Sequence, residues 1–118
     1  MYKYSFEKLA AWRRARELNS DFYKTTRTFP GTERFGLTSQ LRRASVSISS
    51  NIAEGSGRTT NKDQAHFYRI AYGSLMEVLS QLYLCMDLGF LTEKTFVDEI
   101  KPQIESISKP LYALMNKK

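Results

Sequence analysis

The sequence is poor in the residue types that build disulfides, metal sites and most catalytic sites. Its 118 residues include one cysteine, Cys85, and one histidine, His66, with only three prolines and six glycines. A single thiol cannot form an internal disulfide or a thiolate metal cage. With 42% hydrophobic and 25% charged residues the composition is typical of a folded chain, and the length favours one domain over residues 1–118.

Long hydrophobic runs are also missing. The strongly apolar stretches span only a few residues, whereas a membrane-crossing helix needs roughly 18 or more. The first residues, MYKYSFEKLAAWRRA, are polar from the start and lack the apolar core of a signal peptide. We therefore expect no membrane association and, because there is a single cysteine, a reducing cytoplasmic location.

Recognisable catalytic motifs are absent as well. No Gly-x-Ser-x-Gly sequence occurs, and His66 is the only histidine that a triad could use. Asp63 and His66 form one Asp-x-x-His pair, whereas di-iron bundles use two Glu-x-x-His pairs. GSGR at 55–58 lacks the pattern of a phosphate-binding loop and fits the end of a helix better. We expect no enzyme activity, no metal and no cofactor.

Positive charge is present in excess, and all of the excess lies in the first half. Residues 1–59 contain 11 Lys/Arg and 5 Asp/Glu, while residues 60–118 contain 7 of each. This asymmetry predicts either a surface that attracts polyanions or a solvated basic face without a ligand.

Helical periodicity fills most of the chain. Glycine, proline, threonine and asparagine concentrate at 29–36, 54–61 and 88–92 and separate the periodic segments. The pattern predicts an all-α fold with helices at about 6–28, 38–56, 61–88 and 92–116. The connections are short, which favours an antiparallel up-down-up-down four-helix bundle.

Local signals predict where these helices begin and end. We expect Ser5 to cap the first helix, Thr60 or Asn61 to open a capping box at the third, and Gly89 to end it. Apolar residues mark the buried side of the first helix: Leu9, Trp12, Ala15, Leu18, Phe22 and Phe29.

The second helix has a narrow apolar stripe, a polar stripe opposite it and small residues between them. The apolar stripe is Leu37, Leu41, Ala44, Ile48 and Ile52. The polar stripe is Arg43, Ser47, Asn51, Glu54 and Arg58. The small residues predict close approach of another helix: Ser45, Ser49 and Ala53.

The third helix is apolar around much of its circumference. One broad stripe consists of Phe67, Ile70, Ala71, Leu75, Val78, Leu82, Cys85 and Met86. A second stripe beside it consists of Tyr68, Tyr72, Met76, Leu79 and Tyr83. One stripe suits the core of the bundle, and the other could face a neighbouring subunit.

The fourth helix carries a heptad-like seam and two prolines. The seam is Val97, Ile100, Ile104, Ile107, Leu111 and Leu114. Pro102 and Pro110 lie off the seam, but each removes a backbone donor. We expect them to bend the helix or to break its last part.

Arginines are the residues best suited to a ligand, because the guanidinium fork matches phosphate geometry. The candidates for nucleic-acid binding are Arg13, Arg14, Arg16, Arg42, Arg43 and Arg58. The alternative is pairing within the protein: Glu54 lies four residues before Arg58 on one helix. Glu54 and Asn51 could also contact a neighbouring helix.

Several segments together resemble a known family. They are FxxLAAW (6–12), FP with ERFGLTSQLRRASVSISSNIAEGSGR (29–58), and FYRIAYGSLMEV (67–78). From about Phe6 to Leu114 the chain resembles the bacterial four-helix-bundle proteins called 23S rRNA intervening-sequence proteins. The resemblance implies a ring-like pentamer with no established biochemical activity. A related protein, the accessory variability determinant of diversity-generating retroelements, is a basic pentamer that binds nucleic acid and partners a reverse transcriptase.

The family motif maps onto Gln40, Arg42, Arg43, Ala44, Ser47, Asn51, Ala53, Glu54, Gly55 and Arg58. We assign a structural or oligomer-contact role to the following residues: Gln40, Ser47, Asn51, Glu54, Gly55, Tyr68, Tyr72 and Tyr83. Pro102 and Pro110 depart from the family pattern.

Together these features favour a non-enzymatic homo-oligomer, a pentamer by resemblance, that binds RNA or DNA through its basic surface. The alternative is an interaction scaffold for a protein partner, without nucleic-acid binding, in which the motif residues stabilise the oligomer.

Overall fold

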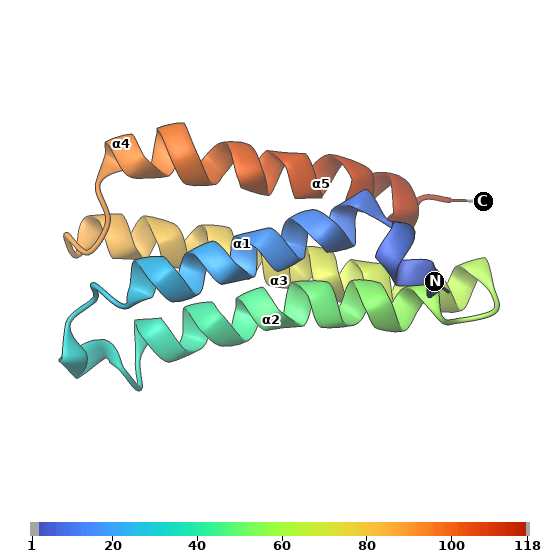
Figure 1. Cartoon of the computed structure of the whole chain (residues 1–118), viewed down its shortest axis with the longest axis horizontal. Coiled ribbons are helices and arrows are strands. Elements are labelled where there is room, and N and C mark those ends of the chain that lie inside the picture. Colours follow the sequence, from blue (N-terminus) through green and yellow to red (C-terminus); the bar gives the residue numbers. More distant parts are fainter. Residues whose placement is uncertain (1–2, 118) are drawn as a thin grey trace.

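The computed structural model describes residues 3–117 and shows four helical rods packed side by side (Figure 1). The first three are α1 (Ala10–Thr26), α2 (Leu37–Ser56) and α3 (Asn61–Asp87). The fourth is composite, with α4 (Glu93–Thr95), the π-helical turn η3 (Phe96–Ile100) and α5 (Lys101–Met115) in succession. No strand occurs among the described residues. The ends of the predicted domain, residues 1, 2 and 118, lie outside them.

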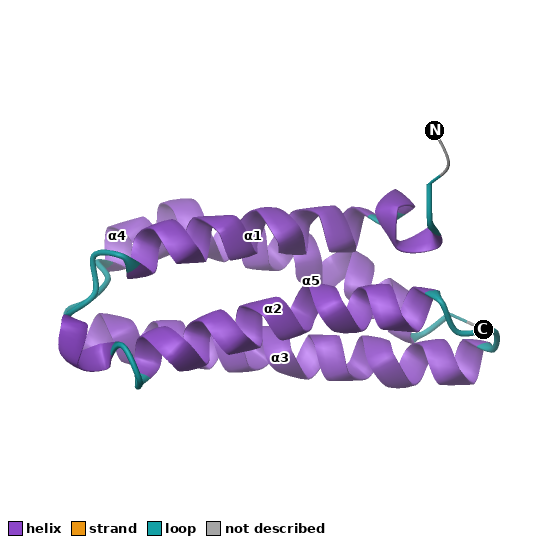
Figure 2. Ribbon diagram, turned by 60° about the horizontal axis from the view of Figure 1, so that its bottom comes forward, coloured by secondary structure: helices purple, strands orange, loops and turns teal. Residues whose placement is uncertain are grey.

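Contacts between the rods are those of an antiparallel bundle with a closed ring of neighbours. Asn19 contacts Ser45 while Thr26 contacts Arg42, so α2 returns along α1. The bundle measures 44 Å along its longest axis, with connections at both ends, and the two termini lie at the same end (Figure 2). The predicted all-α four-helix bundle is confirmed.

The core runs along the axis where the four rods face one another. Its fully buried side chains come from every rod, because each carries apolar residues at three- and four-residue spacing. The largest are Leu18, Phe22, Leu41, Ile48, Ile52, Leu75, Leu82, Ile107 and Leu111. Cys85 lies among them as a free thiol.

The N-terminal segment differs from the predicted continuous helix 6–28. A 3-10 turn, η1 (Ser5–Lys8), comes first, Leu9 is extended, and α1 then begins. Tyr4 rather than Ser5 occupies the cap position, and its backbone N–H donates to the Glu7 carboxylate at 2.8 Å. The Ser5 hydroxyl instead donates to the carbonyl of Ser56 at 3.2 Å, which ties the turn to the end of α2.

The small residues of α2 are explained by its neighbours. Ser45 donates to the side chain of Asn19 on α1 at 3.0 Å, and the hydroxyls of Ser47 and Ser74 lie 2.8 Å apart across the α2–α3 contact. Gly55 is buried, and a Cβ atom there would lie 2.9 Å from Tyr68 Cε1. The two helices approach too closely at this point for a larger residue.

Both predicted ends of α3 are confirmed, and its exposed side is partly different from the prediction. Thr60 caps the helix by accepting from the Asp63 N–H, and Gly89 follows it with φ of +78°. Neither predicted stripe is buried as a whole: Tyr68 of the second stripe is buried, whereas Ile70 of the first stripe is 41% exposed. Both α2 and α5 pack against α3, and together they decide which side of α3 is buried. The distribution of hydrophobic residues along α3 does not identify that side by itself.

In the last rod the predicted seam is wrong at Val97, which is exposed, because the π turn changes the register. Phe96 faces the core instead, next to Ile100, which is buried as the seam predicts. The wide turn closes with a bond from the Lys101 N–H to the Phe96 carbonyl, directly before Pro102, whose ring and missing N–H disfavour a regular α turn.

Of the two expected effects, a bend or a break, the break does not occur at Pro110, since α5 continues to Met115. In a regular helix the residue at 110 would donate to the carbonyl of Ser106. Arg14 from α1 donates to that carbonyl at 2.9 Å. A guanidinium group from a neighbouring helix thus replaces the backbone donor that proline lacks.

Candidate nucleic-acid interface

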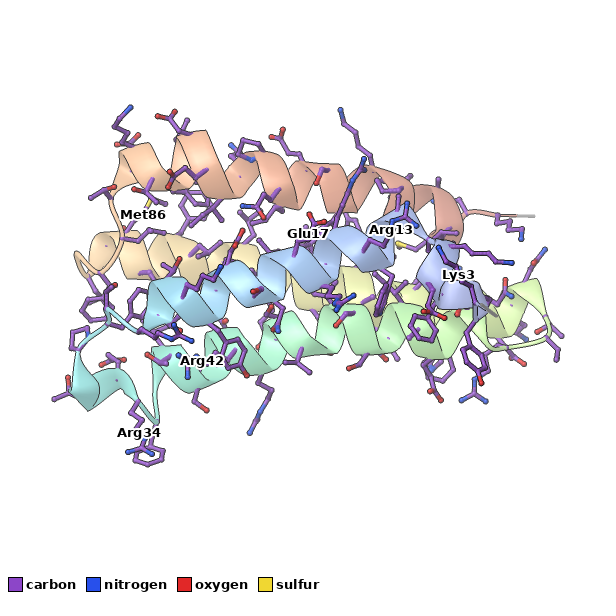
Figure 3. All side chains as sticks on the ribbon, viewed as in Figure 1. Lys3, Arg13, Glu17, Arg34, Arg42 and Met86 are labelled. Carbon is purple, nitrogen blue, oxygen red and sulfur yellow. The ribbon has the colours of Figure 1, made fainter. Side chains whose placement is uncertain are left out.

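A basic cleft of about 460 Å³ lies where the end of α1 meets the start of α2. The loop between them contributes Arg34 and Phe35, and the short 3-10 turn η2 (Gly31–Glu33) shapes that loop. Figure 3 shows Arg34 projecting from the loop before α2, and Arg42 on α2 beside α1. The lining residues are Tyr23, Arg34, Phe35, Thr38, Ser39, Arg42, Arg43 and Val46.

Arg42 is held rigidly on one wall of the cleft. Its Nε donates to the Thr26 hydroxyl at 2.8 Å, and a terminal nitrogen lies 3.4 Å from the Tyr23 carbonyl. The guanidinium carbon also lies 4.4 Å from the centre of the Tyr23 ring. These contacts give the Tyr23 carbonyl in the last turn of α1 a donor and orient Arg42 without any carboxylate partner.

Arg43 and Arg34 keep their charge available. Both are exposed, and neither forms an ion pair or hydrogen bond among residues 3–117. Arg34 lies over the ring of the neighbouring Phe35, at 5.4 Å from its centre. Two unpaired guanidinium groups and one fixed one therefore converge on the same opening.

The first turn of α2 adds to the positive potential of the cleft. The dipole of this 20-residue helix is positive at its N-terminus. Thr38 and Ser39 in that turn line the cleft. The nearby Glu33 carboxylate accepts from the Leu37 backbone N–H at 3.2 Å. Its negative charge therefore lies on the helix terminus and offsets part of the positive potential there.

The predicted arginines of α1 lie elsewhere. Arg13 is ten residues before Tyr23, about 15 Å along the helix, and Figure 3 shows it towards the other end of α1. Arg13 donates to the Glu7 carbonyl at 3.2 Å, and Arg16 lies 5.7 Å from the centre of the Trp12 ring. With Arg14 bound to α5, the three do not share the cleft of Arg42 and Arg43.

Arg58 is paired, as the internal alternative anticipated. Its guanidinium forms a 2.6 Å ion pair with Glu54 and lies 4.5 Å from the centre of the Phe67 ring. Both side chains are about half exposed, so the pair contributes only a few tenths of a kcal/mol. Arg58 follows α2 at the far end from the cleft.

Three of the eight motif residues with a predicted structural role, Ser47, Gly55 and Tyr68, lie in the contact between α2 and α3 of the same chain. Asn51 donates to the Ser47 carbonyl at 2.8 Å, and Ser47 meets Ser74. Gly55 packs on Tyr68, whose burial raises the pKa of the phenol. Tyr72 is half-buried, whereas Gln40 and Tyr83 are exposed.

Sequence reasoning missed the residues that complete the cleft. Tyr23, Arg34 and Phe35 come from α1 and from a loop, outside the arginine pair at 42 and 43. The available signal was the ERFG segment immediately before the second helix, where an Arg-Phe pair occurs in a connection that would otherwise be expected to be polar.

The rest of the described chain offers little other chemistry. No group of three or more potential metal ligands occurs among residues 3–117, and no helix there combines the length and apolarity needed to cross a membrane. Burial, with a smaller effect of the Glu33 charge, raises the pKa of the Cys85 thiol to about 11. The thiol is therefore protonated near neutral pH and unreactive.

Comparison with known proteins agrees with the fold. A search of curated proteins finds no match to the chain. The family described as 23S rRNA-intervening sequence protein matches residues 7–113, which include α1, α2 and α3 in full and all but the last two residues of α5. The chain therefore belongs to the 23S rRNA-intervening sequence protein family.

Proposed function

We propose that the protein binds RNA through phosphate contacts in the cleft of Arg34, Arg42 and Arg43. The observation that supports this most directly is the convergence of three guanidinium groups without a carboxylate partner. Arginine binds phosphate oxygens in a forked geometry, and the start of α2 adds partial positive charge. In this proposal the protein is a cytoplasmic, non-enzymatic homo-oligomer.

Phosphate binding makes the affinity depend on salt, because bound counterions are released from the RNA. Replacing Arg43 with alanine should weaken RNA binding and reduce the slope of log K against log salt by about one. The measurement is fluorescence anisotropy of labelled RNA across a salt series. Arg13→Ala is the matched control, because Arg13 is also exposed but lies near the opposite end of the bundle.

The proposal fails if wild-type protein binds no RNA at low salt, or if Arg43→Ala and Arg13→Ala lower the affinity equally. Light scattering of the same variants shows whether the oligomer is intact. Loss of RNA binding with unchanged mass supports a ligand-binding arginine, whereas dissociation into smaller species supports a role in assembly.

A second candidate, an interaction scaffold, is favoured by a separate hollow whose apolar lining is bordered by Glu93 and Lys101. Tyr83 and Met86 of α3 face Phe96 and Val97 of η3, and this hollow measures about 390 Å³. Tyr83 is 47% exposed and Val97 is 50% exposed. Apolar side chains left open in this way suit a neighbouring subunit or a protein partner. RNA binding and assembly can therefore use different helices, because the cleft lies on α1 and α2 and the hollow lies on α3 and the last rod, towards the same end of the bundle.

A further inference from the structure

Phe35 has no structural role that explains its side chain. The ring is 89% exposed, which is the largest exposure among the large hydrophobic residues described. It lies in the loop before α2, and its contact is with the guanidinium of its neighbour Arg34. A loop position that only connected two helices would favour a polar residue there. The exposed ring is therefore available to a ligand.

Phe35 belongs to the same cleft as the arginines. Tyr23, 37% exposed, and Val46, 42% exposed, also line it. Arg42 lies against the Tyr23 ring, and Arg34 against the Phe35 ring. Each aromatic face is thus adjacent to a positive charge. This combination is typical of surfaces that bind bases by stacking and the attached phosphates by charge.

Stacking on Phe35 requires a base whose face is accessible. In a duplex both faces of each internal base are covered by its neighbours, so a double strand can offer this cleft only its phosphates. An unpaired base can lie flat on an aromatic ring, and recognition of single-stranded RNA commonly uses this contact. A cleft of about 460 Å³ is in the size range of a small-molecule site, which suits a short segment rather than a helix.

On this basis we propose that the cleft binds single-stranded RNA, with one base stacked on Phe35 and an adjacent phosphate bound by Arg43. Arg42 is fixed by Thr26 and Tyr23, so it presents a rigid guanidinium group to a second phosphate. Ser39, which is partly exposed on the cleft and makes no side-chain hydrogen bond among residues 3–117, is available to the same segment. This inference rests on the proposed RNA binding and specifies its substrate class.

The test uses the full chain and three fluorescently labelled probes with equal numbers of phosphates. They are an oligouridylate, an abasic strand of the same length and a duplex RNA. We expect the oligouridylate to bind about tenfold more tightly than the abasic strand, as one stacked base requires. Phe35→Ala should lose about the same factor on oligouridylate and nothing on the abasic strand.

Tyr112→Ala is the matched control, because Tyr112 is an aromatic residue of α5 that is 58% exposed and does not line the cleft. It should leave the affinity for every probe unchanged. The inference is overturned if Phe35→Ala binds oligouridylate as well as wild type does, or if the duplex binds more tightly than the single strand.

The two proposals fail in different ways. If all three probes bind equally and Arg43→Ala weakens them all, phosphate binding stands and base stacking is refuted. If no probe binds at low salt, both proposals are refuted. Phe35 is almost fully exposed, so its replacement removes no core contact, and circular dichroism of the variant verifies the fold.

Discussion

At the scale of single residues, identical amino acids have opposite roles according to what surrounds them. Gly55 and Gly73 both lie inside helices, where glycine lowers stability relative to alanine. A Cβ at Gly55 would lie 2.9 Å from Tyr68 and 3.0 Å from Phe67, whereas nothing lies within 4 Å of one at Gly73. Gly55 therefore permits the close contact of α2 with α3, and Gly73 has no such packing role.

We predict opposite effects when each is replaced with alanine. Gly55→Ala forces a shift of α3 and should lower the free energy of unfolding by about 1–3 kcal/mol. Gly73→Ala introduces no clash and reduces the entropy of the unfolded chain. It should therefore raise the free energy of unfolding by about 0.5–1 kcal/mol. Urea unfolding followed by circular dichroism measures both. Equal effects of the same sign would show that the α2–α3 contact does not depend on Gly55.

At the scale of elements, α5 depends on a side chain from another helix. Pro110 deprives the Ser106 carbonyl of its backbone donor, and Arg14 supplies a replacement at 2.9 Å. The sequence showed two prolines and predicted a bent or broken helix, because periodicity within one segment carries no information about a donor 92 residues away. The same limit explains why Val97 was wrongly placed in the core. The π turn that exposes Val97 depends on how the last rod packs against the other helices, and this packing cannot be read from the periodicity of one segment.

If Arg14 replaces the backbone donor that is missing at Pro110, the effects of substituting these two residues on the free energy of unfolding should not be independent. Arg14→Ala leaves the Ser106 carbonyl without a protein donor and should cost about 1 kcal/mol of unfolding free energy. In a Pro110→Ala background the backbone N–H at 110 can donate instead, so the same substitution should cost clearly less.

A thermodynamic cycle of the two single variants and the double variant, followed by urea unfolding, gives this coupling energy. Arg16→Ala serves as the control, since Arg16 has no contact with α5 among its described interactions. If the changes in unfolding free energy caused by Arg14→Ala and Pro110→Ala simply add in the double variant, Arg14 does not replace the donor that is missing at Pro110.

At the scale of the whole molecule, the basic cleft and the hollow beside Tyr83 lie on different pairs of rods. The basic half of the sequence becomes α1 and α2, which pack side by side, and the neutral half becomes α3 and the last rod (Figure 1). The cleft of Arg34, Arg42 and Arg43 lies on the first pair. The hollow of Tyr83, Phe96 and Val97 lies on the second pair. This separation suits a protein that assembles by one surface and binds a polyanion by another.

We therefore predict that a charge in the hollow disrupts assembly without unfolding the subunit. Val97→Lys places an ammonium group at a half-exposed apolar position, where contact with a second subunit would have to desolvate it. Light scattering should report a lower mass than for wild type. Ser50→Lys, which adds the same charge at an exposed position on α2, should leave the mass unchanged. An unaltered mass for Val97→Lys would exclude the hollow as a subunit contact.

The sequence by itself determined the helices, their caps at Thr60 and Gly89, most of the core and the family, because these depend on local periodicity and on residues close together in the chain. The tertiary structure decided which arginines act together. Arg14 and Arg58 are bound within the protein, whereas Arg34, Arg42 and Arg43 meet at one cleft. The physical reason is that hydrogen bonding and ion pairing depend on distances between helices, and those distances follow from packing that no single segment encodes.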